Sequence, residues 1–133
     1  MSTNLITAIT ELDKSNFKTK IYAGGHFIYA DEPESIGGSD EGMTPGALLL
    51  ASLGSCTAIT IRMYADRKGY ALDGVKIDLS ICEEKEMSKE TTISRKIELL
   101  GDLSEEQRER LLQIADKCPI HKILSNTIKI ETN

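Results

Sequence analysis

The longest apolar stretch of the chain is residues 44–69, which reads TPGALLLASLGSCTAITIRMYADRKG. Thr44 fits a helix N-cap, and Pro45 suits the first helical position. The helical pattern runs to Lys68, where Gly69 provides a C-terminal stop. The first four turns are apolar on all sides, which is typical of a helix that other elements cover. We therefore predict a long central helix that is buried in the middle of the fold.

A membrane span is the alternative interpretation of this stretch, because residues 42–61 carry no charged side chain. However, Pro45, several glycines and five Ser/Thr residues dilute the apolar character, and Arg62 follows at once. Residues 1–6 show no basic segment followed by an apolar one, so no secretory signal is predicted. The formal net charge of −5 disfavours nucleic acid and anionic membrane surfaces as partners. We expect a soluble, cytoplasmic protein.

Short strands and turns precede the helix. Alternating β-branched, aromatic and polar residues predict three strands that form an antiparallel meander, at residues 4–12, 17–23 and 26–30. The Gly24-Gly25 pair marks the second turn. Residues 31–43 form an acidic, glycine-rich loop without apolar periodicity, and we expect this loop to be mainly solvated.

The chain after the helix continues the mixed pattern. A strand is predicted at 75–81, a charged connection at 83–90, a partner strand at 91–99 and a final strand at 127–131. Ser104 and Gln107 form a capping box that begins a second helix, which ends near Cys118 because Pro119 follows. Residues 120–124 suit one more helical turn. The order βββ-α-ββ-α-β predicts a single α+β domain over residues 1–133, with antiparallel sheets around the central helix.

Three cysteines, an odd number, suggest a reducing compartment in which the thiols are free. Cys56 lies in mid-helix and is either a small core residue or a thiol that needs a cation from another element. Cys118 is either a helix-end residue or an accessible thiol beside His121 and Lys122. Cys82 precedes two carboxylates, which favours a packing role. No CxxC or HxxxH spacing occurs, so no metal site is predicted.

Several segments resemble the OsmC/Ohr family of thiol-dependent hydroperoxide reductases. They are DEP at 31–33, GGSDEG at 37–42, the long helix at 44–69, and CPIHK at 118–122. Chain length and the order of elements agree as well. The resemblance implies an OsmC-like fold and an intertwined homodimer with two sites at its interface. It also implies that Cys56 is the peroxidatic thiol, that Cys118 is the resolving thiol, and that no metal or cofactor takes part.

Two departures from the family concern the activation of the thiol. Gly46 stands where the best-studied members have a Glu, and no Arg precedes Arg62, whereas those members use an Arg from the N-terminal strands. Their Arg-Glu network therefore cannot be carried over. We hypothesise that His26, Lys18 or Lys20 approaches Cys56 across the dimer interface. His121 is a further candidate beside Cys118, whereas the structural interpretation of His26 is a hydrogen-bonded strand residue.

Two functions follow from the resemblance. The first is reduction of small organic hydroperoxides by the Cys56/Cys118 pair through a sulfenic acid and a disulfide, reset by a dithiol reductant, in oxidative-stress defence. The second is an OsmC-like protein without peroxidase activity that binds a small hydrophobic ligand in the dimer cleft. The two retained cysteines favour the first function, and the missing Arg and Glu favour the second.

Overall fold

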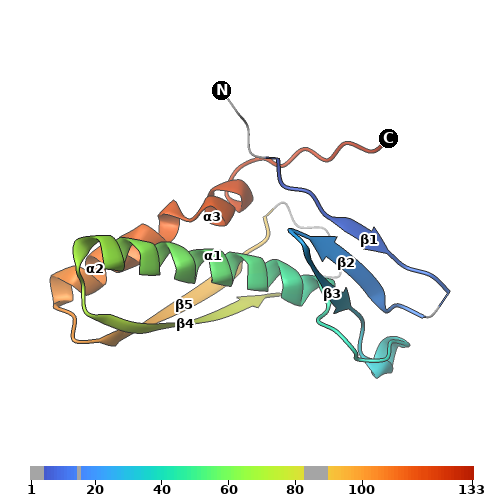
Figure 1. The fold of residues 1–133 in the computed structure, drawn as a ribbon, viewed down its shortest axis with the longest axis horizontal. Coiled ribbons are helices and arrows are strands. Elements are labelled where there is room, and N and C mark those ends of the chain that lie inside the picture. Colours follow the sequence, from blue (N-terminus) through green and yellow to red (C-terminus); the bar gives the residue numbers. More distant parts are fainter. Residues whose placement is uncertain (1–4, 15, 83–89) are drawn as a thin grey trace. The chain divides into compact units, whose positions relative to one another are not determined.

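The computed structural model describes residues 5–14, 16–82 and 90–133. They fall into two compact units, which meet along the chain between Leu49 and Leu50. The prediction of a single domain is not tested by this division and stays a prediction. Figure 1 labels the helices and strands of both units.

The first unit is built on a three-stranded antiparallel sheet, as predicted. Its strands are β1 (Ile9–Glu11), β2 (Thr19–Ala23) and β3 (His26–Ala30), in the order β1-β2-β3. Gly24 and Gly25 form the β2–β3 turn with φ of +58° and +79°, a backbone that glycine adopts readily. β1 is shorter than predicted because its partner strand ends at Ala23, where the chain turns.

The acidic loop is mostly exposed, as predicted, but it is organised around one buried carboxylate that was not predicted. Asp31 is 1% exposed and accepts hydrogen bonds from the backbone N–H groups of Glu32, Ser39 and Glu41. Burial by itself raises the pKa of Asp31, but the three N–H donors and Lys18 bring the pKa below its usual value. The loop also contains a 3₁₀ turn, η1 (Glu34–Ile36). Asp31 was missed because acidic composition alone does not show which carboxylate faces inward.

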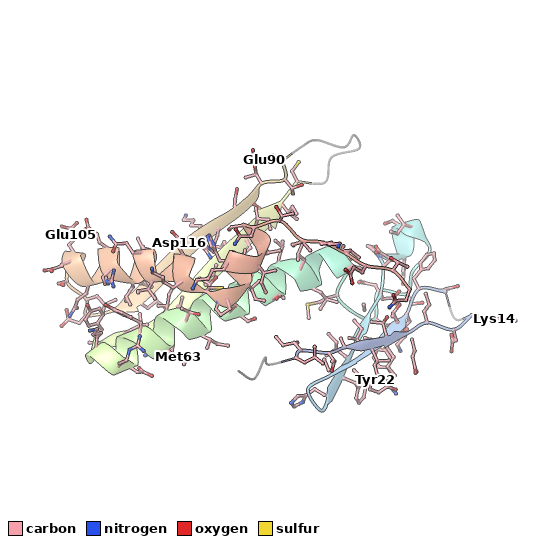
Figure 2. The ribbon with its side chains drawn as sticks, turned by 90° about the horizontal axis from the view of Figure 1, so that it is seen from above. Lys14, Tyr22, Met63, Glu90, Glu105 and Asp116 are labelled. Atoms are coloured by element: carbon pink, nitrogen blue, oxygen red, sulfur yellow. The ribbon has the colours of Figure 1, made fainter. Side chains whose placement is uncertain are left out.

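The long helix α1 (Pro45–Lys68) begins and ends as predicted. The Thr44 hydroxyl accepts the Ala47 N–H at 3.2 Å, and Gly69 follows the last turn with φ of +70°. Burial is one-sided within the described residues, with Leu53, Thr57, Ile61, Tyr64 and Ala65 buried. Ile59 and Met63 are exposed, and Met63 projects outward (Figure 2). The predicted burial on all sides is therefore not provided by this chain alone, because helices and strands cover only one face.

α1 also has the length and apolar composition of a membrane-spanning helix. The core helix of a soluble protein meets the same criterion, so length and composition do not distinguish the two. Five residues of α1 are buried, and Ile61, Tyr64 and Ala65 among them belong to the core of the second unit.

The second unit packs a hairpin and a helix against α1. Its strands β4 (Leu72–Ile81) and β5 (Ile93–Gly101) pair antiparallel, and α2 (Glu105–Ile114) begins with the predicted Ser104–Gln107 capping box. Figure 1 shows α1 crossing this hairpin with α2 beside it. The core residues come from all four elements and their links: Ile61, Tyr64, Ala65, Leu72, Leu99, Leu103, Leu111, Ile114 and Ala115. The predicted connection at 83–90 lies, except for Glu90, outside the described residues.

The C-terminal segment carries one confirmed element and one correction. A 3₁₀ turn, η2 (Ala115–Lys117), leads through Cys118 into α3 (Pro119–Leu124), the predicted extra helical turn. The predicted strand at 127–131 is wrong for this chain, since these residues form no strand and are exposed. A strand needs a neighbour for its N–H and C=O groups, and no described strand of the chain pairs with this segment.

Candidate functional site

The two predicted site cysteines lie together in the second unit. Cys56 comes from the middle of α1, and Cys118 lies between η2 and α3. The two thiols lie close enough for each to affect the pKa of the other. Cys118 is fully buried, whereas Cys56 is partly exposed. Cys56 is therefore the more solvent-accessible sulfur of the two.

The first turn of α3 places a backbone donor on the Cys118 sulfur. Pro119 occupies the first position of α3, and the N–H groups of a first helical turn have no partner within the helix. The His121 N–H donates to the Cys118 sulfur at 3.4 Å, and the Ile120 N–H acts to lower the pKa of both thiols. The Cys-Pro sequence therefore fixes the local geometry that receives a thiolate.

The hydrogen bonds shift the two thiols in opposite directions. Burial and the neighbouring Cys118 sulfur raise the pKa of Cys56, against smaller lowering effects of the Ile120 N–H and the Thr60 hydroxyl. Burial also acts to raise the pKa of Cys118, but hydrogen bonds from Cys56, the His121 N–H and the Thr57 hydroxyl outweigh it and lower that pKa. The lower pKa of the pair is therefore that of Cys118.

Arg95 on β5 is a residue of this site that the sequence analysis did not select. Its guanidinium donates to the Thr57 hydroxyl at 3.0 Å, to the Ala115 carbonyl at 3.5 Å and to the Asp116 carboxylate at 2.9 Å. The alternation of β5 offered a signal, because Arg95 lies in the inward-facing phase with Ile93 and Ile97. A charged residue at an inward-facing position of a strand is unusual, and it indicates that the charge has partners inside the fold.

His121 reaches the pair through its backbone. Its imidazole Nε2 lies 3.9 Å from Asp116, on the exposed side of the site, while its N–H donates to Cys118. Figure 2 labels Asp116, which lies between α2 and α3. The predicted role of the His121 side chain in activating a thiolate stays a prediction.

The other proposed activating residues belong to the first unit. Lys18 pairs with Glu41 at 3.6 Å and lies over the Tyr29 ring, and Lys20 lies over the Tyr22 and Phe27 rings. His26 opens β3 and is exposed. The predicted approach of Lys18, Lys20 or His26 to Cys56 involves a partner chain and stays a prediction. Cys82, predicted to have a packing role, is in fact exposed at the end of β4.

A hollow of about 580 Å³ lies next to Leu53, Arg95 and His121, close to the cysteine pair. Its lining combines three apolar side chains with five polar or charged ones: Leu53, Ile93 and Leu124, and Glu90, Thr91, Arg95, His121 and Ser125. Leu53 lies one turn before Cys56 and Thr57 on α1. The hollow can hold a small organic molecule with an apolar body and a polar group.

The chain was compared with known families and structures. A family model described as OsmC-like protein matches residues 38–133. The crystal structure of an OsmC-like protein from Mycoplasma pneumoniae has 19% sequence identity and a TM-score of 0.75, covering 94% of this chain and 89% of that chain. Comparison with curated proteins finds no match.

Two further solved structures carry names that mention peroxide resistance. An organic hydroperoxide resistance protein OsmC from Legionella pneumophila has 16% identity and a TM-score of 0.66, covering 93% of this chain and 91% of that chain. An organic hydroperoxide resistance protein from Elizabethkingia anophelis has 13% identity and a TM-score of 0.70, covering 96% and 93%. At these identities the likeness extends to the fold.

Proposed function

The chain belongs to the OsmC-like protein family, and we propose that it reduces small organic hydroperoxides with Cys56 and Cys118. The close approach of two thiols from separate elements, Cys56 in α1 and the buried Cys118 between η2 and α3, is the observation that carries the proposal. A pair in contact can complete a redox cycle through a disulfide without metal or organic cofactor. The hollow beside Leu53 supports a substrate with an apolar body.

The proposed reaction starts from Cys56 as thiol and Cys118 as thiolate. As the Cys56 sulfur attacks the outer peroxide oxygen, the O–O bond breaks. The Cys56 proton passes by way of Cys118 to the leaving alkoxide, which becomes the alcohol and leaves Cys118 as a thiolate. Cys56 is now a sulfenic acid. The Cys118 sulfur then attacks the Cys56 sulfur and expels hydroxide, which leaves a disulfide. The peroxide is reduced by two electrons, and both sulfurs together lose two.

A dithiol reductant returns the pair to its starting state by thiol–disulfide exchange. The partly exposed Cys56 is the sulfur that such a reductant can attack, since Cys118 is buried. The proposal includes a homodimer, whose second copy would cover apolar residues such as Ile59 and Met63 on the exposed face of α1. It also includes a cytoplasmic location and a role in oxidative-stress defence.

The second candidate function is binding of a small hydrophobic ligand without peroxidase activity. The observation that favours it is the absence of the family's activating Glu, since Gly46 leaves open space at that position of α1. In this case the hollow beside Leu53 would hold the ligand, and neither cysteine would be among its lining residues.

Peroxide consumption separates the two candidates. Reduced protein is mixed with cumene hydroperoxide and an excess of dithiol, and peroxide loss is followed for the wild type, Cys56→Ser and Cys118→Ser. We expect sustained loss with the wild type and none above background with Cys56→Ser. Cys118→Ser is assayed without dithiol, and we expect at most one slow turnover, which leaves a sulfenic acid that dimedone traps. Background rates for all three proteins would exclude the peroxidase and leave the ligand-binding function.

A further inference from the structure

The Arg95 guanidinium is a nearly buried charge whose partners lie on both sides of the cysteine pair. The side chain is only 13% exposed, although an isolated buried charge is costly. Its donors are paired with three acceptors on different elements. Two of the acceptors, Thr57 and Ala115, are buried. The guanidinium is therefore directed into the fold, toward residues that lie close to Cys56 and Cys118 in the sequence.

Arg95 ties together the two elements that carry the sulfurs. Thr57 directly follows Cys56 on α1. Ala115 begins η2, the 3₁₀ turn that directly precedes Cys118. The guanidinium fork has fixed geometry, so its bonds to Thr57 and Ala115 fix the separation of these elements. A change at Arg95 is therefore felt at both sulfurs without Arg95 touching either of them.

The Thr57 hydroxyl is the link between this charge and the Cys118 sulfur. Thr57 is fully buried and donates to the Leu53 carbonyl at 2.7 Å, and its hydroxyl lies near enough to Cys118 to act on the pKa of that thiol. A hydroxyl has one proton and two lone pairs. Because Arg95 donates to the oxygen, the proton is free to turn between the Leu53 carbonyl and the sulfur. A thiolate is the stronger acceptor, so ionisation draws the proton toward Cys118.

We infer that Arg95 is a positioning residue of the dithiol, acting through the Thr57 hydroxyl to keep the negative charge on Cys118. Arg95 brings an arginine side chain to the site from β5, whereas the first 61 residues contain no arginine. The inference deepens the proposed function, and the catalytic use of this positioning rests on that function. Its test reads the thiolate itself, so failure of the peroxidase activity and failure of the Arg95 role are distinguishable.

Two other ionisable side chains bear on the same pair. Asp116 in η2 binds Arg95 at 2.9 Å and partly neutralises it, and the His121 imidazole in α3 lies 3.9 Å from Asp116. α1 contributes Cys56 itself and the hydroxyls of Thr57 and Thr60. Removing the Asp116 charge should strengthen the effect of Arg95, and removing the His121 imidazole should leave it in place.

The test is a pH titration of thiolate absorbance at about 240 nm in a Cys82→Ser parent, which removes the exposed third thiol. Absorbance reports a buried thiolate without a reagent that must reach it. We expect Arg95→Met to raise the midpoint of the first thiolate by about one pH unit, as loss of a nearby cation does. Arg95→Lys should restore part of the shift. Arg62→Met is the matched control, because Arg62 pairs with Asp66 on the exposed side of α1.

Variants of Thr57 and Asp116 make the inference independent of the folding of Arg95→Met. Thr57→Val should shift the midpoint like Arg95→Met, Thr57→Ser should not, and the Arg95/Thr57 double variant should not exceed either single one. Asp116→Asn, at an exposed position, should lower the midpoint. An unchanged midpoint in Arg95→Met or Asp116→Asn overturns the inference. Additive shifts in the double variant, or loss of the Arg95 effect in a His121→Gln background, overturn it as well.

Discussion

Oxidation of the cysteine pair should stabilise the second unit. A Cys56–Cys118 disulfide closes a loop of about 60 residues, for which the chain-entropy model gives about 4 kcal/mol of stabilisation at 25 °C. The two thiols are already neighbours in the reduced protein, so we expect the bond to close with a small approach of α1 and the η2–α3 link. Some of the gain is lost to strain and to the hydrogen bonds given up. We therefore expect a net stabilisation of about 2–4 kcal/mol.

Urea unfolding measures this difference directly. The Cys82→Ser protein is oxidised with diamide, which forms disulfides without requiring any peroxidase activity, and mass spectrometry checks the loss of two hydrogens. The denaturant slope is about 1–3 kcal/mol per molar urea for small proteins, so the midpoint should rise by about 1 M or more. Protein concentration is held constant, since association would also shift the midpoint.

Cys118→Ser in the same background is the matched control, because it keeps a small polar side chain and cannot form the bond. Its midpoint should be the same with and without diamide. If the parent forms the intramolecular disulfide and its midpoint is unchanged or lower, the two sulfurs are not held in a geometry that accepts the bond, and the reasoning above is refuted.

Three further predictions concern the frame of the site. Leu111→Ala should cost about 2–5 kcal/mol in urea unfolding, because the Leu111 side chain is fully buried between α2 and α1; a loss below 1 kcal/mol would contradict that packing. Gly46→Ala should stabilise α1 by about 0.5–1 kcal/mol, since a Cβ there meets open space, whereas Gly42→Ala should destabilise through contact with the Tyr29 carbonyl; the two thermal midpoints should move in opposite directions. The pKa of Asp31 is lower in the folded protein, so its stabilising contribution is present above about pH 4 and is lost as pH falls through the folded pKa. Asp31→Asn should therefore have a flatter thermal midpoint between about pH 5 and pH 2, and an equally steep acid decline in both proteins would exclude this role.

Local signals in the sequence predicted the elements well wherever the chain satisfies its own hydrogen bonds. Thr44, Gly69 and the Ser104–Gln107 capping box mark helix ends through contacts within a few residues, so they could be identified without knowing the fold. The segment at 127–131 shows the opposite case. Its alternation is typical of a strand, but a strand forms only beside a neighbour, and alternation does not supply one.

The site divides in the same way. The residue types and the family resemblance singled out Cys56 and Cys118, because a thiol in each of two characteristic contexts is visible in the linear sequence. Their order of ionisation was not visible. It depends on the Ile120 and His121 N–H groups, which the Cys-Pro turn directs at the sulfurs, and on the desolvation of both thiols.

The sequence by itself determined that two cysteines from separate helices belong to an α+β fold, and that the family's usual Arg and Glu are missing from their expected positions. Only the tertiary structure decided which charge stands near the pair. Arg95 lies 39 residues after Cys56 and 23 before Cys118 in the sequence, and it meets their neighbours because β5 packs between α1 and η2. A long-range contact of this kind follows from packing, since hydrogen bonds between distant elements leave no local pattern in the chain.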